Sequence, residues 1–180
     1  MQTLTTADRE LIEHAGQYDA RALAELYDRY AEPIYRYLYR FVGDAAQAED
    51  LTGEVFLRLL QALGTPRAPR EQLPGWLYGV AHNLATDWFR SNSRHPALSL
   101  AEDLVADGDL PSTAVEKRQA QKQLRAALRR LTADQQRVIL LRFGEGFKLG
   151  EVARLLGKSE GAVKILQHRA VQRLRTLLQS

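Results

Sequence analysis

The chain has 180 residues, of which 45% are hydrophobic and 26% are charged, a composition typical of a soluble globular protein and not of a disordered one. It contains no cysteine, which excludes disulfides and thiolate zinc sites. It begins without a secretory signal pattern and has no apolar stretch long enough to cross a bilayer, so we expect a cytoplasmic protein without membrane insertion.

The net charge of +3 is unevenly distributed along the chain. Residues 1–116 hold 10 Lys+Arg and 18 Asp+Glu, a net charge of −8, whereas residues 117–180 hold 15 and 4, a net charge of +11. A small basic region of this kind is typical of nucleic-acid-binding proteins. We therefore expect nucleic acid as the partner of the second region and a basic surface as the partner of the first.

Helical periodicity dominates the first half of the chain, and almost no segment alternates as a strand does. Residues 7–15 predict a short amphipathic helix, and Asp19 is a candidate N-cap for a long helix rich in aromatic residues. Pro33 lies inside this long helix, where it removes one backbone donor. Gly43 is predicted to end it, and Asp44 is predicted to cap the next helix.

That next helix, over residues 44–63, has an apolar side and an acidic side. The residues predicted to face inward are Leu51, Val55, Phe56, Leu59 and Leu60. Carboxylates in the first turn of a helix often do no more than interact favourably with the helix dipole. This explanation is sufficient for Asp44 and extends to Glu49, but Glu54 lies too far from the start of the helix for it to apply. A docking surface for a protein partner is the alternative. The candidate docking residues are Asp44, Glu49, Asp50 and Glu54.

Prolines and glycines over residues 63–75 predict a loop, and a helix follows over residues 76–91. Its apolar stripe is predicted to be buried and consists of Trp76, Leu77, Val80, Leu84 and Trp88. Its other side presents polar groups beside aromatic rings, an arrangement that suits single-stranded bases. The candidate contacts are His82, Asn83, Asp87, Trp88 and Arg90, although Trp and Phe on a helix, Trp88 included, more often belong to the core. No nucleophile, metal-ligand cluster or phosphate loop accompanies them, so we expect no catalytic site, cofactor, metal or small-molecule substrate.

Residues 94–112 interrupt the helical pattern with two prolines, a glycine and four acidic residues, and they predict a flexible acidic linker. The predicted fold is therefore all-α, with two small helical domains over residues 1–93 and 113–180. Helices are predicted over residues 113–130 and 132–143, ahead of a helix-turn-helix.

The helix-turn-helix is predicted over residues 149–175. Gly157 follows the last apolar residue of the first helix, where a left-handed C-cap favours glycine, and Ser159 can cap the second helix. Ala153 is small where the two helices must cross. Side chains of the second helix are then candidates for entering a DNA major groove. The candidate contacts are Ser159, Glu160, Gly161, Lys164, Gln167, His168, Arg169 and Arg173, with Arg142 as a further phosphate contact. An ordinary helical hairpin with a solvated basic face is the alternative.

Three segments, in this order, resemble the extracytoplasmic-function (ECF) sigma factors of bacterial RNA polymerase. The segment GDAAQAEDLTGEVFLRLL is similar to the family's core-binding segment, WLYGVAHNLATDWFR to its −10 segment, and EGFKLGEVARLLGKSEGAVKILQHRAVQRLR to its −35 reader. The resemblance implies that residues 1–93 bind core RNA polymerase and the −10 element and that residues 113–180 bind the −35 element. It also implies that the linker runs toward the RNA exit path, that the protein is not an enzyme, and that promoter DNA and an anti-sigma factor are partners.

Two positions depart from the family pattern. Gly53 stands where the family usually has Gln, and it should cost helix stability of roughly 1 kcal/mol against Ala. Leu149 and Gly150 replace polar or aromatic residues before Glu151. The main alternative function is a two-domain helix-turn-helix regulator that acts without polymerase, and a helical adaptor that binds only proteins is a more distant one. The regulator would not need an acidic docking helix together with an aromatic DNA-contacting helix, and DNA binding by residues 117–180 would exclude the adaptor.

Overall fold

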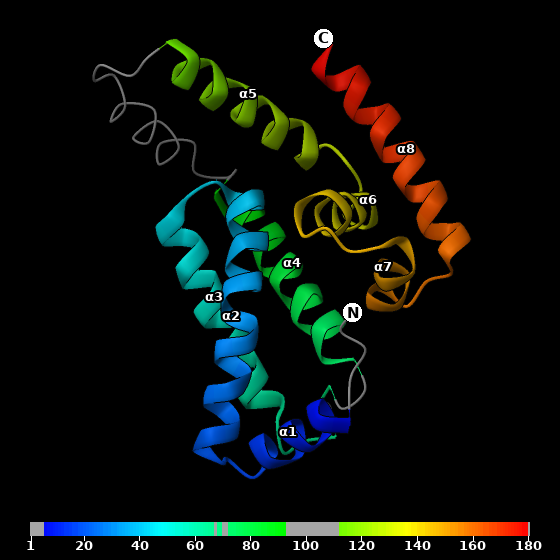
Figure 1. Cartoon of the computed structure of the whole chain (residues 1–180). Helices are drawn as coiled ribbons and strands as arrows, with labels where there is room; N and C mark the ends of the chain where they lie inside the picture. Colours follow the sequence, from blue (N-terminus) through cyan, green and yellow to red (C-terminus); the bar gives the residue numbers. More distant parts are fainter. Residues whose placement is uncertain (1–5, 67, 70–71, 93–111, 180) are drawn as a thin grey trace.

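The structure, a computed structural model, describes residues 6–66, 68–69, 72–92 and 112–179 (Figure 1). Within these residues the chain is helical and has no strand, which confirms the predicted all-α class. The predicted linker lies outside the described residues except for Ser112. The elements are α1 (Thr6–Gly16), α2 (Ala20–Val42), α3 (Ala45–Ala62), α4 (Leu73–Asn92), α5 (Ser112–Arg129), α6 (Ala133–Ile139), the π-helix η2 (Leu140–Gly144), α7 (Leu149–Leu156) and α8 (Glu160–Leu178).

Local caps set the ends of α2 and the start of α3, as the sequence predicts. The Asp19 carboxylate accepts a hydrogen bond from the Ala22 backbone N–H at 2.9 Å. Gly43 ends α2 with φ 86°, a left-handed conformation that costs glycine little. The Asp44 carboxylate then accepts from the Gln47 backbone N–H at 2.6 Å. These caps hold α2 and α3 as a tight helical hairpin.

The helix α4 begins earlier than predicted. The sequence predicts a loop through Gly75, but the helix starts at Leu73, and the Trp76 N–H already donates to the Gln72 carbonyl at 2.9 Å. Pro74 is compatible with this start because N–H groups in the first turn have no intrahelical acceptor and the fixed φ of proline suits a helix. Gly75 is therefore a helical residue, which matters for its packing below.

The predicted helix over residues 132–143 is divided into two segments. At its start, the Thr132 hydroxyl accepts from the Gln135 N–H, and the Gln135 side chain accepts from the Thr132 N–H, which makes a capping box. At its end the backbone widens into η2, where the Glu145 N–H donates to the carbonyl of Leu140, five residues earlier. Segments of π-helix are rare and occur frequently at functional sites.

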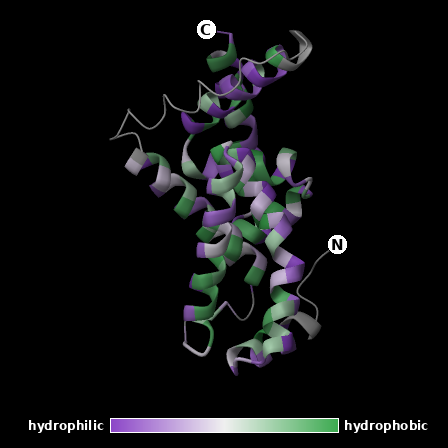
Figure 2. Ribbon diagram, turned by 90° about the vertical axis from the view of Figure 1, so that its left-hand side faces the viewer, coloured by the Kyte–Doolittle hydropathy of each residue, from purple (hydrophilic) through white to green (hydrophobic). Residues whose placement is uncertain are grey.

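Each helix buries part of its surface and exposes the rest. Every helix in Figure 2 therefore carries both hydrophobic and hydrophilic residues. In α3 the predicted stripe is buried at Leu51, Val55, Phe56 and Leu59. Leu60 is 38% exposed, so its predicted inward orientation is wrong. Successive residues of a helix point about 100° apart, and Leu59 occupies the centre of the buried side. Leu60 is therefore turned away from that side.

The helices form two parts that pack against each other. The N-terminal part (α1–α4) is built around α2, which packs against α3 and α4, and the C-terminal part (α5–α8, including η2) is built around α8 and α6 (Figure 1). Between the parts, α4 contacts α7, and α2 contacts α5 and η2. One connected group of buried hydrophobic side chains extends through both. Among the described residues, none of the helices has the length and apolar character needed to span a bilayer.

Candidate nucleic-acid interface

The helices α7 and α8 form the predicted helix-turn-helix. Gly157 ends α7 with φ 61° and ψ 36°, and the Ser159 hydroxyl accepts from the Ala162 N–H at 3.2 Å to cap α8. Both predicted caps are therefore confirmed. Ala153 and Val163 are buried where the two helices pack together. The angle between the helices is thus fixed by one left-handed glycine and by small side chains.

Gly150, one of the two departures from the family pattern, lies beside the first residue of α8. A Cβ atom at this position would lie 2.7 Å from a carboxylate oxygen of Glu160. That oxygen is the far end of an exposed, flexible side chain, which can move aside at little cost. Gly53, the other departure, is exposed, and an added Cβ would meet nothing within 4 Å. Packing therefore requires glycine at neither position.

Most of the predicted contacts on α8 are exposed, while Ala170 on the opposite side is buried and Leu166 and Leu174 pack against the core. The helix thus presents one polar, mainly basic side to solvent. The exposed members of the predicted set are Ser159, Glu160, Gly161, Lys164, His168, Arg169 and Arg173.

Gln167 differs from these residues because Arg142 holds it. The Arg142 Nε donates to the Gln167 Oε1 at 3.2 Å, and the Arg142 Nη1 donates to the Phe147 carbonyl at 2.6 Å. Arg142 therefore ties η2 to α8 and to the turn before α7. These bonds use its Nε and Nη1, and the phosphate contact predicted for Arg142 stays a prediction.

The helix α4 carries the second set of predicted contacts, and several of them already have partners. Asp87 and Arg90 are exposed and form an ion pair at 3.2 Å. The Asn83 Oδ1 accepts from the Arg137 Nη2 of α6 at 3.0 Å. Trp88 is half-buried against the core, and its ring meets that of Phe89 edge-on at a centroid distance of 4.6 Å. Its predicted burial is therefore only partial.

His82 does not lie on the exposed side of α4, so its predicted position beside Asn83 is wrong. The side chain is only 1% exposed, is hydrogen-bonded through Nδ1 to the Tyr37 hydroxyl at 3.0 Å, and packs against the Phe41 ring. Burial lowers the pKa of His82 to about 4, and the nearby Arg137 cation acts in the same direction. We withdraw His82 as a DNA contact, because a neutral imidazole inside the fold cannot reach a base.

The acidic side of α3 is a separate surface on the N-terminal part. Glu49 and Asp50 are exposed, Asp44 caps the helix, and Glu54 forms an ion pair with Arg58 at 3.0 Å. A groove of about 650 Å³ lies between α2 and α3 and combines carboxylates with aromatic rings. Its lining residues are Tyr27, Asp28, Ala31, Glu32, Tyr35, Glu49 and Thr52. Such a groove suits a basic protein surface.

The sequence gives no indication of the charged contacts that join the two parts. The Glu145 side chain is 4% exposed and pairs with both Arg36 and Arg40 of α2. The Arg129 guanidinium lies over the Phe89 ring of α4, 4.0 Å from its centroid. Partners that lie this far apart in the sequence follow no spacing rule, so periodicity and motif searches cannot find them. In the described residues, no group of His, Asp or Glu is arranged to hold a metal ion.

Both parts match sequence models of known domains. Residues 26–95 match sigma-70 region 2, and residues 127–176 match sigma-70 region 4. The ECF RNA polymerase sigma factor BldN of Streptomyces coelicolor is 41% identical over 171 residues, 94% of this chain and 65% of that relative. The ECF sigma factor SigX of Bacillus subtilis is 35% identical over 83% of this chain and 80% of that relative. The chain belongs to the ECF sigma factors.

Solved structures agree with the fold of this sigma factor. CnrH, solved in complex with the cytosolic domain of CnrY, has a TM-score of 0.65 and 23% identity, and the match covers 96% of this chain and 97% of that one. The sigma factor RpoE, solved with the anti-sigma factor NepR from Bartonella quintana, has a TM-score of 0.50 and 18% identity, covering 87% and 96%. This sigma factor spans 65% of the length of BldN.

Proposed function

We propose that this sigma factor binds core RNA polymerase and directs promoter-specific initiation, with −35 recognition by residues 113–180 and −10 recognition and strand opening by residues 1–93. The observation that carries the proposal is the exposed polar side of α8, which a capped helix-turn-helix presents on the basic part of the chain. The N-terminal end of a reader helix enters the major groove first. Residues 94–112 then serve as the linker between the two DNA-binding parts.

On α8, two groups of residues have different roles. Base reading is assigned to Glu160, Gly161, Lys164 and Gln167, with His168 at their edge, because these residues begin the helix. Glu160 can accept from a cytosine amine, and Lys164 can donate to guanine acceptors. Arg169 and Arg173 lie further along and contact phosphate, which positions the domain without reading sequence. Ser159 stays the cap on which this geometry depends.

On α4, capture of unpaired −10 bases is assigned to Asn83, Asp87 and Arg90, with Trp88 and Phe89 as adjacent aromatic rings. Unpaired bases stack on aromatic rings near positive charge, and each stacked base contributes roughly 1–3 kcal/mol. Promoter opening then needs binding free energy only, so we assign no catalytic residue, cofactor or enzymatic step. The site of action is the cytoplasm, where RNA polymerase works. An anti-sigma factor is a further proposed partner, since a protein of the same fold, RpoE, was solved with one.

The acidic side of α3 is assigned to core polymerase. Complementary charge at the rim of an interface mainly speeds association and suppresses wrong partners. Glu49 and Asp50 are exposed, and Glu54 has only an exposed ion pair to give up. The alternative, a regulator that acts without polymerase, is not favoured, because both parts match sigma-70 domains.

Charge reversal on α3 tests this function. The double variant Asp50→Lys/Glu54→Lys should keep the fold, because neither side chain is buried, and should bind core polymerase more slowly and with a changed salt dependence. A matched control is Glu10→Lys/Glu13→Lys, which reverses two exposed charges on α1 and changes the net charge equally. Equal association rates for the two double variants at low salt would reject the assignment of α3 to polymerase.

A further inference from the structure

One large apolar side chain lies among the polar residues on the exposed side of α8. Ile165 is 54% exposed, although most of the apolar residues of this helix face the core. Val163, for example, is buried, and Leu166 packs against the core. In the part of α8 that the structure describes, the other exposed large apolar side chain is Leu178, at the C-terminal end. Ile165 is therefore an apolar residue at the end of the helix that is assigned to base reading.

Helix geometry places Ile165 in the middle of the exposed side. Successive residues are about 100° apart around the helix axis, so Ile165 lies about 160° from the buried Val163. It lies only about 40° from Gly161, one turn earlier, and about 60° from His168. Helical side chains extend back toward the N-terminal end of their helix, so the Ile165 side chain lies over the turn that contains Gly161.

Gly161 leaves the space next to Ile165 open. Glycine has no side chain, and a Cβ atom added at this position would meet nothing within 4 Å. Isoleucine itself gains little at a solvated helix position, because its branched Cβ restricts χ1 and because unbranched residues stabilise a helix better. Single apolar residues are common on protein surfaces, but this one is on the side that is assigned to the major groove, where binding removes water.

The polar residues assigned to base reading mainly suit G·C pairs. Glu160 fits the amine of cytosine, and Lys164 fits the acceptors of guanine. Glutamine reads adenine with both atoms of its amide, but the Gln167 Oε1 already accepts from the Arg142 Nε at 3.2 Å. Thymine presents a methyl group in the major groove, and apolar side chains contact this group favourably. Ile165 has the chemistry that an A·T pair needs.

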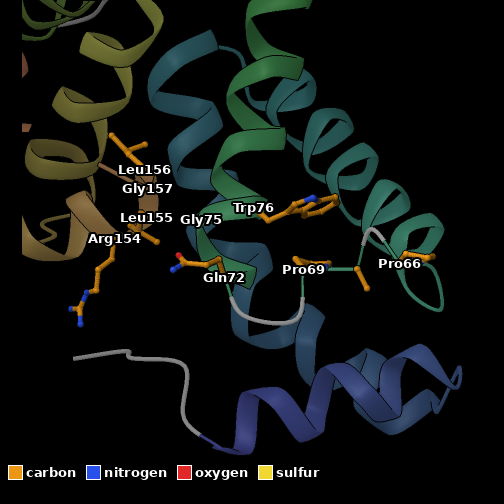
Figure 3. A pocket seen from close by; sticks show the side chains of 10 residues that line it. Pro66, Pro69, Gln72, Gly75, Trp76, Arg154, Leu155, Leu156 and Gly157 are labelled. Carbon is orange, nitrogen blue, oxygen red and sulfur yellow. The ribbon is translucent and has the colours of Figure 1, made fainter. Parts of the chain in front are cut away.

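The packing of the two parts leaves Ile165 accessible. A Cβ atom added at Gly75 in the first turn of α4 would lie 2.6 Å from the Leu155 carbonyl oxygen of α7. Beside this approach lies a groove of about 730 Å³, with Trp76 and the α3–α4 connection on one side and the end of α7 on the other (Figure 3). Its described lining residues on the C-terminal part all precede α8, and they are Arg154, Leu155, Leu156 and Gly157. This contact therefore leaves the exposed side of α8 free.

We propose that Ile165 is a specificity-determining residue of α8 that contacts the C5-methyl group of one thymine in the −35 element. The proposal rests on the function proposed above, and it adds an apolar contact to the polar ones. A thymine methyl group that packs against Ile165 is removed from water, which stabilises the complex. Uracil presents the same hydrogen-bonding groups as thymine without the methyl group. Replacement of that thymine by uracil therefore removes this contact alone.

Substitution of single bases in the DNA tests the contact. The full chain is first used to select duplexes from a random library, which defines the element that it binds. Each thymine of the selected element, on either strand, is then replaced by uracil, and the Kd is measured for wild type, Ile165→Ala and Leu178→Ala. Ile165→Ala should keep the fold, because the side chain is exposed and alanine favours a helix. Leu178→Ala is the matched control, since it shortens a side chain of similar exposure, 48%, at the other end of α8.

For wild type and Leu178→Ala, we expect uracil at one position to raise the Kd about fourfold, which corresponds to the loss of one buried methyl group. For Ile165→Ala, thymine and uracil at that position should bind equally. The same rise in Kd for all three proteins would overturn the contact. So would a wild type that binds every uracil duplex as well as the thymine duplex, or one that selects an element without thymine.

Failure of the proposed function gives a different result. The wild type would then bind selected and scrambled duplexes with the same Kd, which would reject sequence reading by α8 and the role of Ile165 with it. A wild type that prefers the selected duplex but is indifferent to uracil would reject only the role of Ile165.

Discussion

The two helices assigned to DNA contact, α8 and α4, differ in what covers them. On α8 most of the candidate side chains are exposed, and Arg142 holds Gln167. On α4, Asp87 and Arg90 are exposed, but the C-terminal part takes the Asn83 acceptor and places Arg129 over the adjacent Phe89 ring. A duplex can therefore approach α8 directly, whereas a single strand must compete with the protein at Asn83 and Phe89.

This difference has a physical basis in how the two helices are stabilised. The helix α8 packs on α5, α6 and α7, and its buried residues are Val163 and Ala170. The helix α4 packs against α2, α3 and α7 and buries more residues, among them Leu77, Ala81 and Ala85, while Asn83, Asp87 and Arg90 stay exposed. The greater burial stabilises α4 through packing, but it leaves less surface for a ligand. The predictions below compare the covered helix with the open one.

The largest expected effect concerns His82, the most deeply covered candidate on α4. Its pKa in the fold is about 4, against 6.5 for the unfolded group, so the unfolded chain binds more protons between these values. The contribution to stability is complete above pH 6.5 and is lost as the pH falls toward 4, a total of about 3 kcal/mol. His82→Gln should remove this slope while keeping an acceptor for the Tyr37 hydroxyl. Urea unfolding at several pH values measures it, and parallel slopes for the two proteins would contradict the burial of a neutral His82.

The next effect concerns Lys164 on the open helix. Lys164→Ala should weaken binding to the cognate −35 duplex by roughly 1–3 kcal/mol, because a base-reading donor is lost, and should change binding to scrambled duplex much less. Arg173→Ala is the matched control: it should weaken both duplexes about equally and reduce the salt slope by about one phosphate contact. Titrations of both variants against both duplexes measure this. Equal losses on the two duplexes for Lys164→Ala would make it a phosphate contact.

The helix-turn-helix and the helix caps could be predicted because their signals are local. The left-handed Gly157 and the Ser159 cap lie within three residues of the groups they serve, and the same is true of Asp19 and Asp44. A cap depends on one turn of backbone, so the sequence of that turn is enough to identify it. Gly43, which ends α2 in a left-handed conformation, is a local signal of the same kind.

The covered side of α4 could not be predicted, because it depends on residues far away in the sequence. Apolar residues at helical spacing identify only one buried side of a helix. In α4 a second covered side contains Tyr78, His82 and Ala85, since α2 brings Tyr37 against it. The sequence separation of this pair is 45 residues, and that of Arg36 and Glu145 is 109. Because His82 is polar, its sequence predicts an exposed side chain, whereas in the fold it is buried and hydrogen-bonded to the Tyr37 hydroxyl.

A smaller effect separates Asn83 from its partner Arg137. Asn83→Ala should weaken opening of promoter DNA by the equivalent of one hydrogen bond, about 0.5–1.5 kcal/mol, whereas Arg137→Ala should leave it unchanged or improve it by freeing the acceptor. Permanganate footprinting of the −10 region with the complete polymerase measures opening. If Asn83→Ala opens the promoter as well as wild type does, the assignment of α4 to the −10 strand is wrong. If both variants lose opening equally, the two side chains act together in the open complex.

The smallest effect compares two glycines that have open space around them, Gly161 at the start of α8 and Gly79 in α4. An alanine at either position meets nothing within 4 Å, and it restricts the unfolded chain, so each substitution should raise the free energy of unfolding by up to about 1 kcal/mol. The two should then differ in DNA binding. Gly161 lies on the exposed side that enters the groove, where an added methyl group reaches the bases before Lys164 does, so Gly161→Ala should weaken the cognate duplex selectively. Gly79→Ala should leave duplex binding unchanged. Thermal unfolding and duplex titration of both variants decide the matter: equal affinities would show that the backbone of α8 stays away from the bases at Gly161, and the reading surface would then begin at Lys164.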